Sequence, residues 1–174
     1  MNNQLTTDQL KELLEIQKEF DSRIPTLNLQ DSKVAYVVEF FEWFNTLETF
    51  KNWKKKPGKP FDVQLDELAD LLAFGLSIVN QQEHDDLEIL DYIEDYNDII
   101  KNIIVNFNDK YEVDEFMKNI NQLYSSVFTN YLFLPFAIAK RYYSIDQLIQ
   151  AYKKKMERNH ARQDGKIDKD KGYV

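Results

Sequence analysis

The sequence predicts an all-α, single-domain helical bundle of about six helices. Only four glycines and four prolines occur in 174 residues, and they fall mainly between long segments whose apolar residues recur every three to four positions. This period is typical of amphipathic helices, because it places the apolar side chains on one face. The chain length and the 43% hydrophobic fraction suit one domain with a buried core.

The first two helices are bounded by capping residues and by prolines. The first is predicted over residues 8–20, with Thr7 as its N-cap, and Pro25 breaks the chain after it. The second is predicted over residues 31–53, where a lysine run and a Pro-Gly pair end it.

Four further helices complete the predicted bundle. Pro135 bends or stops the fifth helix, and Ser144 with Gln147 forms a capping box that begins the last one. The second and third helices are apolar on more than one face, which places them at the centre of the bundle. The four ranges are 62–80, 86–106, 113–134 and 144–160.

The composition excludes several classes of site. The chain has no cysteine, so disulfides, thiolate zinc sites and cysteine nucleophiles are ruled out. Two histidines, far apart in the sequence, do not suggest a histidine metal site, so any metal ion is expected to have oxygen ligands. No apolar run reaches the 18 residues of a membrane span. We therefore expect a soluble, cytoplasmic protein with no membrane partner.

Two acidic pairs lie inside the apolar central helices. Glu39 and Glu42 are three residues apart in the second helix, and Glu67 and Asp70 are three apart in the third. Residues with this spacing share one helix face, so side-by-side packing would bring four carboxylates together. Their repulsion would be relieved by hard divalent cations such as Mg²⁺, and two or more ions could bridge a pyrophosphate and activate water. The alternative is that these are ordinary solvated acids.

Gln17 and Trp53 are candidates for contact with a nucleotide base. Gln17 falls on the apolar stripe of the first helix, and its amide can both donate to and accept from a pyrimidine edge. Trp53, beside the lysine run, could stack on a base. Alternatively, Gln17 is a partly exposed polar residue, and the lysines stabilise the helix end through its dipole.

The C-terminal region is basic, whereas the rest of the chain is acidic. Residues 151–174 carry a net charge of +4 and the first 150 residues carry −12. On a helix Lys155, Asn159 and Arg162 share one face, which suits a phosphate chain. The region could bind nucleic acid, but the acidic bulk would repel a duplex, so we favour an anionic substrate and predict no nucleic-acid partner.

Taken together, these residues resemble the dimeric, all-α dUTPases, relatives of the MazG-like nucleoside triphosphate pyrophosphatases. The resemblance spans almost the whole chain in the right order, and its compact length is similar to the phage-encoded branch. Its motifs are L-L-E-I-Q at 13–17, E-F-F-E-W-F-N-T-L-E-T-F-K-N-W at 39–53, D-E-L-A-D-L-L-A-F-G-L-S at 66–77 and Y-K-K-K-M-E-R-N-H-A-R-Q at 152–163.

The resemblance implies a dUTP diphosphatase that hydrolyses dUTP, and also dUDP, to dUMP. It implies two or more Mg²⁺ ions held by the four acids of the two pairs, and we predict Glu39 or Glu42 as the general base. Gln17 would read uracil and Trp53 would lie near the base. Lys155, Asn159 and Arg162 would contact phosphates, and Tyr173 is assigned to the substrate site.

The resemblance also implies how the chain is organised. Residues 1–163 would form the all-α dUTPase domain, and residues 164–174 a flexible basic tail that closes over the site. The family works as a homodimer. A phage-encoded member would act in the host cytoplasm, with a pathogenicity-island repressor protein as a possible further partner.

Two alternative functions stay open from the sequence. One is a MazG-like pyrophosphatase for another nucleotide such as dCTP, since an amide at Gln17 can rotate to suit uracil or cytosine. The other, from a different class, is an interaction protein whose helical bundle binds the repressor without hydrolysing nucleotides.

Overall fold

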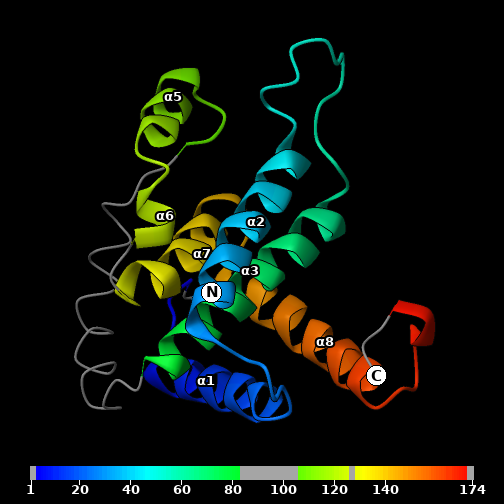
Figure 1. Ribbon diagram of the computed structural model, residues 1–174. Helices are drawn as coiled ribbons and strands as arrows, with labels where there is room; N and C mark the ends of the chain where they lie inside the picture. The colour runs from blue at the N-terminus through cyan, green and yellow to red at the C-terminus, as the bar shows by residue number, and fades with distance from the viewer. Residues whose placement is uncertain (1–2, 83–105, 126–127, 172–174) are drawn as a thin grey trace.

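A computed structural model describes residues 3–82, 106–125 and 128–171 of the chain. Within these ranges the regular structure is entirely helical, which confirms the all-α prediction. The described elements are α1 (Thr7–Asp21), α2 (Leu29–Leu47), α3 (Phe61–Gln81), α5 (Lys110–Lys118), α6 (Gln122–Ser125), α7 (Phe128–Tyr142), α8 (Ile145–Gln163) and the 3-10 helix η1 (Lys169–Lys171) (Figure 1).

Helices α2 and α3 form the centre of the bundle, as the sequence predicts. They lie side by side, and α3 also packs against α1, α7 and α8 (Figure 1). Phe40 and Trp43 of α2 and Leu68 and Leu72 of α3 are fully buried. Burial of each such side chain contributes roughly 1.5–3 kcal/mol, so the position of α2 against α3 is strongly determined.

The helix starts follow capping chemistry. Thr6, and not Thr7 as predicted, caps α1: its Oγ1 accepts from the Gln9 backbone N–H at 3.2 Å, and Gln9 Oε1 accepts from the Thr6 N–H at 3.0 Å. Both halves of a capping box are therefore present. Ser144 caps α8 as predicted, and its Oγ accepts from the Gln147 N–H at 3.1 Å.

Helix α2 ends earlier than the sequence predicts. Glu48 adopts a left-handed conformation with φ 55°, and its side chain is almost completely buried. Its carboxylate accepts hydrogen bonds from Lys51 at 3.3 Å, Lys54 at 2.6 Å and the Gly58 backbone N–H at 3.1 Å. The predicted continuation to residue 53 is therefore wrong. Trp53 lies in the loop after α2 and is 71% exposed.

Helix α7 continues through Pro135, which was expected to bend or stop a helix over 113–134. That range is divided among α5, α6 and α7, and α7 runs on to Tyr142. Pro135 has no N–H for the carbonyl of Tyr131, four residues earlier. At that same carbonyl Gly75 of α3 makes a close approach, because a Cβ at this position would overlap the Tyr131 oxygen.

Two further boundaries bear on the predictions. Helix α8 extends to Gln163, three residues beyond the predicted end at position 160. The predicted helix over 86–106 lies, apart from Asn106, outside the described residues. Among the described helices, none combines the length and the apolar character that crossing a membrane requires.

Candidate active site

Three carboxylates from the two central helices converge. Glu39 of α2 and Glu67 and Asp70 of α3 each offer one oxygen, and these oxygens lie within 4.8 Å of one another. Each belongs to one of the predicted pairs, and the helical spacing turns Glu67 and Asp70 toward the same side of α3. We call Glu39, Glu67 and Asp70 the acidic cluster.

The acidic cluster is electrostatically unfavourable without an added cation. Burial, and then the charges of Asp70, Glu42 and Glu67, raise the pKa of Glu39 to about 8. Burial also raises the pKa of Glu67 and Asp70, although the charge of Lys155 opposes both shifts. The Oε2 atom of Glu39 is buried and lacks a hydrogen-bond partner. An all-oxygen group with an unsatisfied buried ligand atom fits a hard divalent cation.

Glu42 lies beside the acidic cluster but outside the three-oxygen group. Its side chain is exposed, whereas Glu39 is partly buried. Its charge contributes to the raised pKa of both Glu39 and Glu67, which places it within electrostatic reach of them. The assignment of Glu42 as a metal ligand or general base stays a prediction.

The acidic cluster opens into a cleft of about 590 Å³ between α1, α2, α3 and α8. Its acidic side chains come from α2 and α3, its basic and polar ones come from α8, and Lys155 of α8 contacts Asp70 of α3 directly, while Phe20, Ile24 and Phe74 add apolar surface. This is the arrangement that an anionic substrate with a divalent cation requires. The cleft is lined by Phe20, Ile24, Glu39, Glu67, Asp70, Phe74, Lys155, Asn159, Arg162 and Gln163.

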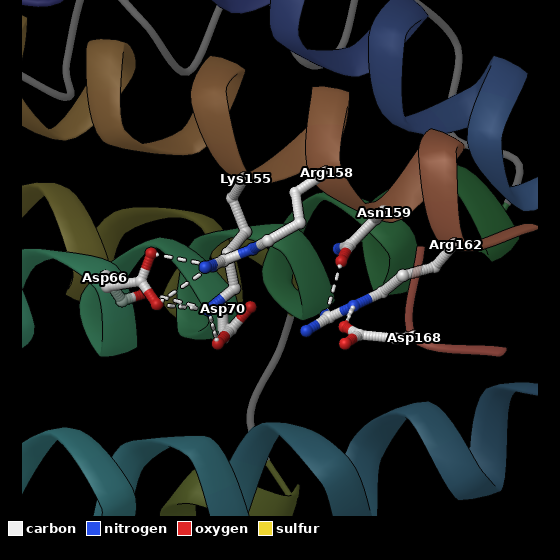
Figure 2. Close-up of polar contacts among 7 residues, drawn as sticks. All are labelled: Asp66, Asp70, Lys155, Arg158, Asn159, Arg162 and Asp168. Atoms are coloured by element: carbon white, nitrogen blue, oxygen red, sulfur yellow. Dashed lines mark hydrogen bonds and ion pairs between the residues drawn. The ribbon is translucent and has the colours of Figure 1, made fainter. Parts of the chain in front are cut away.

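The basic wall comes from one face of α8. Figure 2 shows Lys155 and Arg158 pointing from α8 toward α3, with Asn159 and Arg162 further along the same helix. Lys155 Nζ forms ion pairs with Asp66, at 2.8 Å, and with Asp70. The predicted trio Lys155, Asn159 and Arg162 is thus brought to the cleft.

The pKa values of Asp66 and Asp70 move in opposite directions, although both acids contact Lys155. Burial works to raise the pKa of Asp66, but hydrogen bonds from Lys155 and Arg158 outweigh it and lower the value. Asp70 is more deeply buried, with a side chain 20% exposed against 41% for Asp66. Its raised pKa is consistent with this deeper burial beside Glu39 and Glu67.

Arg162 is held in place by two neighbours. Its Nε donates to Asp168 Oδ2 at 2.7 Å, and its Nη1 donates to Asn159 Oδ1 at 3.1 Å (Figure 2). Asp168 belongs to the segment after α8, so the C-terminal segment contacts the basic wall. Whether residues 164–174 close over a bound substrate stays a prediction.

Gln17 is buried, but it is not among the residues that line the cleft. Its Nε2 donates to Asp21 Oδ1 at 2.8 Å, and its Oε1 accepts from the Tyr152 hydroxyl at 3.1 Å. Both ends of the amide are therefore engaged inside the bundle. Trp53 is also outside the cleft lining, and Tyr173 lies outside the described residues. Their assignments to the base and the substrate stay predictions.

Asp66 and Arg158 contact the basic wall and the neighbourhood of the acidic cluster, but they were not among the predicted site residues. Arg158 Nη2 lies 2.8 and 3.0 Å from the two carboxylate oxygens of Asp66. Asp66 directly precedes Glu67 and is four residues from Asp70, so its helical spacing was a usable signal. The apolar lining residues Phe20, Ile24 and Phe74 resemble ordinary core positions in the sequence, and nothing in the pattern separates them.

Comparison with models of protein families shows which family the chain belongs to. The model of a family described as dUTPase matches residues 9–166. This match includes every residue that lines the cleft. The chain belongs to the all-α dUTPase family.

As a dUTPase, the protein is a dUTP diphosphatase, an enzyme that hydrolyses dUTP. Enzymes of this kind generally depend on a divalent metal, and the acidic cluster is where the residues present could hold one. A search of curated proteins finds no significant match to the chain.

Proposed function

We propose that this dUTPase hydrolyses dUTP, and also dUDP, to dUMP in a Mg²⁺-dependent reaction within the cleft. The observation that carries the proposal is that the acidic cluster lines one cavity together with Lys155, Asn159 and Arg162. A nucleotide phosphate chain is anionic and needs cationic partners on both sides, which the cluster with its metal and the basic wall would supply.

Glu39, Glu67 and Asp70, with Glu42 beside them, are the proposed Mg²⁺ ligands. Two or more ions held there would neutralise the phosphate chain and lower the pKa of a bound water. Glu39 or Glu42 takes the proton of the attacking water. A deprotonated carboxylate within reach of the water can accept this proton, and side chains of this type commonly serve as general bases.

Lys155, Asn159 and Arg162 are the proposed phosphate ligands. Arg162 offers a planar, bidentate donor set, and its contacts with Asn159 and Asp168 limit the orientations that it can adopt. An oriented guanidinium loses less conformational freedom on binding, so the contact with phosphate is stronger. Tyr173 and the rest of the C-terminal tail would then exclude bulk water from the bound nucleotide.

Gln17 is the proposed uracil reader and Trp53 the proposed neighbour of the base. The buried position of Gln17 adds a requirement to this proposal. To contact uracil, Gln17 must exchange its hydrogen bond with Asp21 or Tyr152 for one with the base. The base pocket would therefore form beside α1 and α8, next to the cleft wall that contains Phe20.

The proposal includes a homodimer. Val34, Val38 and Phe41 lie on one face of α2 and are between 39% and 50% exposed. Exposed apolar side chains in a row are typical of an interface. Size-exclusion chromatography with light scattering should give the mass of two chains, and Val38→Glu should lower it toward one. A monomeric wild-type protein would contradict this part of the proposal.

A nucleotide panel tests the proposed reaction. Purified protein is incubated with dUTP, dUDP, dCTP, dTTP and UTP, with Mg²⁺ or with EDTA, and nucleoside monophosphate, pyrophosphate and phosphate are measured. We expect dUTP to give dUMP and pyrophosphate, and dUDP to give dUMP and phosphate, only with Mg²⁺.

The same panel separates the alternatives. Faster hydrolysis of dCTP than of dUTP would contradict dUTP as the preferred substrate and support the alternative of a pyrophosphatase for another nucleotide. Failure to hydrolyse any nucleotide, together with tight binding of a repressor protein, would instead support the interaction-protein alternative.

A further inference from the structure

Asp66 lies next to the acidic cluster but is not part of it. Its carboxylate is not in the three-oxygen group, and Asp66 does not line the cleft. It nevertheless contacts both basic side chains that point from α8 toward α3, Lys155 and Arg158 (Figure 2). The distances are 2.8 Å to Lys155 Nζ and 2.8 Å to Arg158 Nη2.

Lys155 contacts two carboxylates, one inside the acidic cluster and one outside it. Its side chain is only 8% exposed, and its ammonium forms ion pairs with Asp66 outside the acidic cluster and with Asp70 inside it. A buried ammonium requires such partners, because an unpaired charge in this environment is very costly. In the described structure, the Lys155 ammonium therefore contributes positive charge to the acidic cluster.

A divalent cation and the Lys155 ammonium compete for Asp70. If Asp70 binds Mg²⁺, the cation repels the Lys155 ammonium next to it. If the ammonium moved away from Asp70 with no other partner, its buried positive charge would be unpaired. Asp66 removes this obstacle because it already contacts the same Nζ atom.

Building on the proposed metal-dependent function, we propose that Asp66 is a positioning residue for Lys155. It keeps the ammonium paired when a divalent cation takes over Asp70, and so leaves Lys155 beside the cleft to contact the phosphate chain. Arg158 fixes Asp66 for this role through its two contacts with the Asp66 carboxylate, at 2.8 and 3.0 Å.

A double-mutant cycle on metal affinity tests the proposal without measuring turnover. Mg²⁺ binding to nucleotide-free protein is measured by titration calorimetry for wild type, Asp66→Asn, Lys155→Gln and the double variant. In Asp66→Asn the ammonium loses its ion pair at position 66 and keeps the ion pair with Asp70 and a 3.4 Å contact with the backbone carbonyl of residue 66, so Mg²⁺ affinity should fall about 10-fold, the lower end of the effect of removing a group that orients a metal site. Lys155→Gln removes the competing cation, so Mg²⁺ should bind more tightly than to wild type.

The decisive comparison is the effect of Asp66→Asn in the two backgrounds. If Asp66 acts through Lys155, adding Asp66→Asn to Lys155→Gln should change Mg²⁺ affinity by less than about twofold. Equal losses in both backgrounds would mean that Asp66 acts by its charge alone, and would overturn the proposal. Asp62→Asn, one turn earlier on the exposed side of α3, is the matched control for loss of one charge. Asp66→Glu, which keeps the carboxylate, should restore most of the affinity.

A measurement on the wild-type protein avoids any dependence on the folding of variants. The lysine ammonium signal of Lys155 is followed by ¹H–¹⁵N NMR while Mg²⁺ is added. We expect this signal to shift as Mg²⁺ saturates the site, and an unchanged signal at saturation would overturn the proposal. Absence of Mg²⁺ binding by the wild type would instead refute the metal-dependent function itself, which distinguishes the two failures.

Discussion

Glu39 of α2 and Asp70 of α3 approach each other across the central helix pair, with carboxylate oxygens within 4.8 Å. Burial of Glu39, followed by the negative charge of Asp70, raises the pKa of Glu39 to about 8. Near neutral pH the metal-free site therefore retains a proton on Glu39. A bound divalent cation would displace this proton, which links metal binding to pH.

Stability of the metal-free protein should fall as pH rises. The pKa of Glu39 in the folded protein exceeds its ordinary value of 4.5, so its stabilising contribution is complete below about pH 4.5 and is lost as pH rises through about 8. With EDTA present, the melting temperature of wild type should drop between pH 5 and pH 9 by more than that of Glu39→Gln. Parallel pH profiles for the two proteins would show that Glu39 does not titrate in this range.

Substitution of Glu67 should remove activity without unfolding the protein. Glu67→Gln keeps the shape of the side chain but takes one negative charge from the acidic cluster. We expect dUTP hydrolysis to fall at least about 100-fold, more than is typical for residues that only orient a metal ligand. Far-UV circular dichroism should be unchanged. Glu15→Gln, on the exposed side of α1, is the matched control, and wild-type-like activity of Glu67→Gln would exclude the metal assignment.

Tyr152 should influence base discrimination if Gln17 reads uracil. Its hydroxyl donates to Gln17 Oε1 and so fixes which end of the amide faces Asp21. Tyr152→Phe removes that donor, worth about 0.5–1.5 kcal/mol, so preference for dUTP over dCTP should weaken by up to about tenfold. The ratio of kcat/KM for the two nucleotides is the measurement.

Tyr143→Phe is the control for this comparison. The Tyr143 hydroxyl donates to Gln64 at 2.7 Å and lies outside the cleft lining. An equal loss of discrimination in Tyr143→Phe and Tyr152→Phe, or none in either, would argue against Gln17 as the base reader.

Glu48 should stabilise the protein at neutral pH but not in strong acid. Hydrogen bonding to Lys54 lowers the pKa of Glu48 to about 2, with Lys51 and the Gly58 N–H assisting and burial opposing the shift. A lowered pKa gives stability that is present above the ordinary value near 4.5 and is lost as pH falls through about 2. The melting temperature of Glu48→Gln should therefore lie below wild type at pH 7. The difference in melting temperature between the two proteins should shrink toward pH 2. A constant difference would contradict a lowered pKa for Glu48.

The helix content and the proximity of Glu67 to Asp70 could be predicted because both depend on local sequence patterns. Apolar periodicity identified α2 and α3 as core helices, and the three-residue spacing placed Glu67 and Asp70 together. The end of α2 could not be predicted, because Phe50 and Trp53 continue the apolar pattern. The stop depends on Glu48 burying its carboxylate against residues up to ten positions later.

The position of Gln17 was predicted more accurately than its contacts. Its place on the apolar stripe of α1 correctly indicated burial, and it is 3% exposed. Its partner Tyr152 lies 135 residues away, on α8. A contact between such distant residues depends on how α1 and α8 pack, which a single sequence does not reveal.

The crossing of α3 and α7 at Gly75 has a consequence for how the site can change. A Cβ at Gly75 would overlap the Tyr131 carbonyl of α7, whereas it would only contact the Tyr36 ring of α2, so a larger residue there would push α3 away from α7. Glu67 and Asp70 on α3 would then shift relative to Glu39 on α2, although no acid has been replaced. The spacing of the acidic cluster, and with it the fit for a divalent cation, would therefore depend on Gly75, a residue that offers no ligand atom of its own.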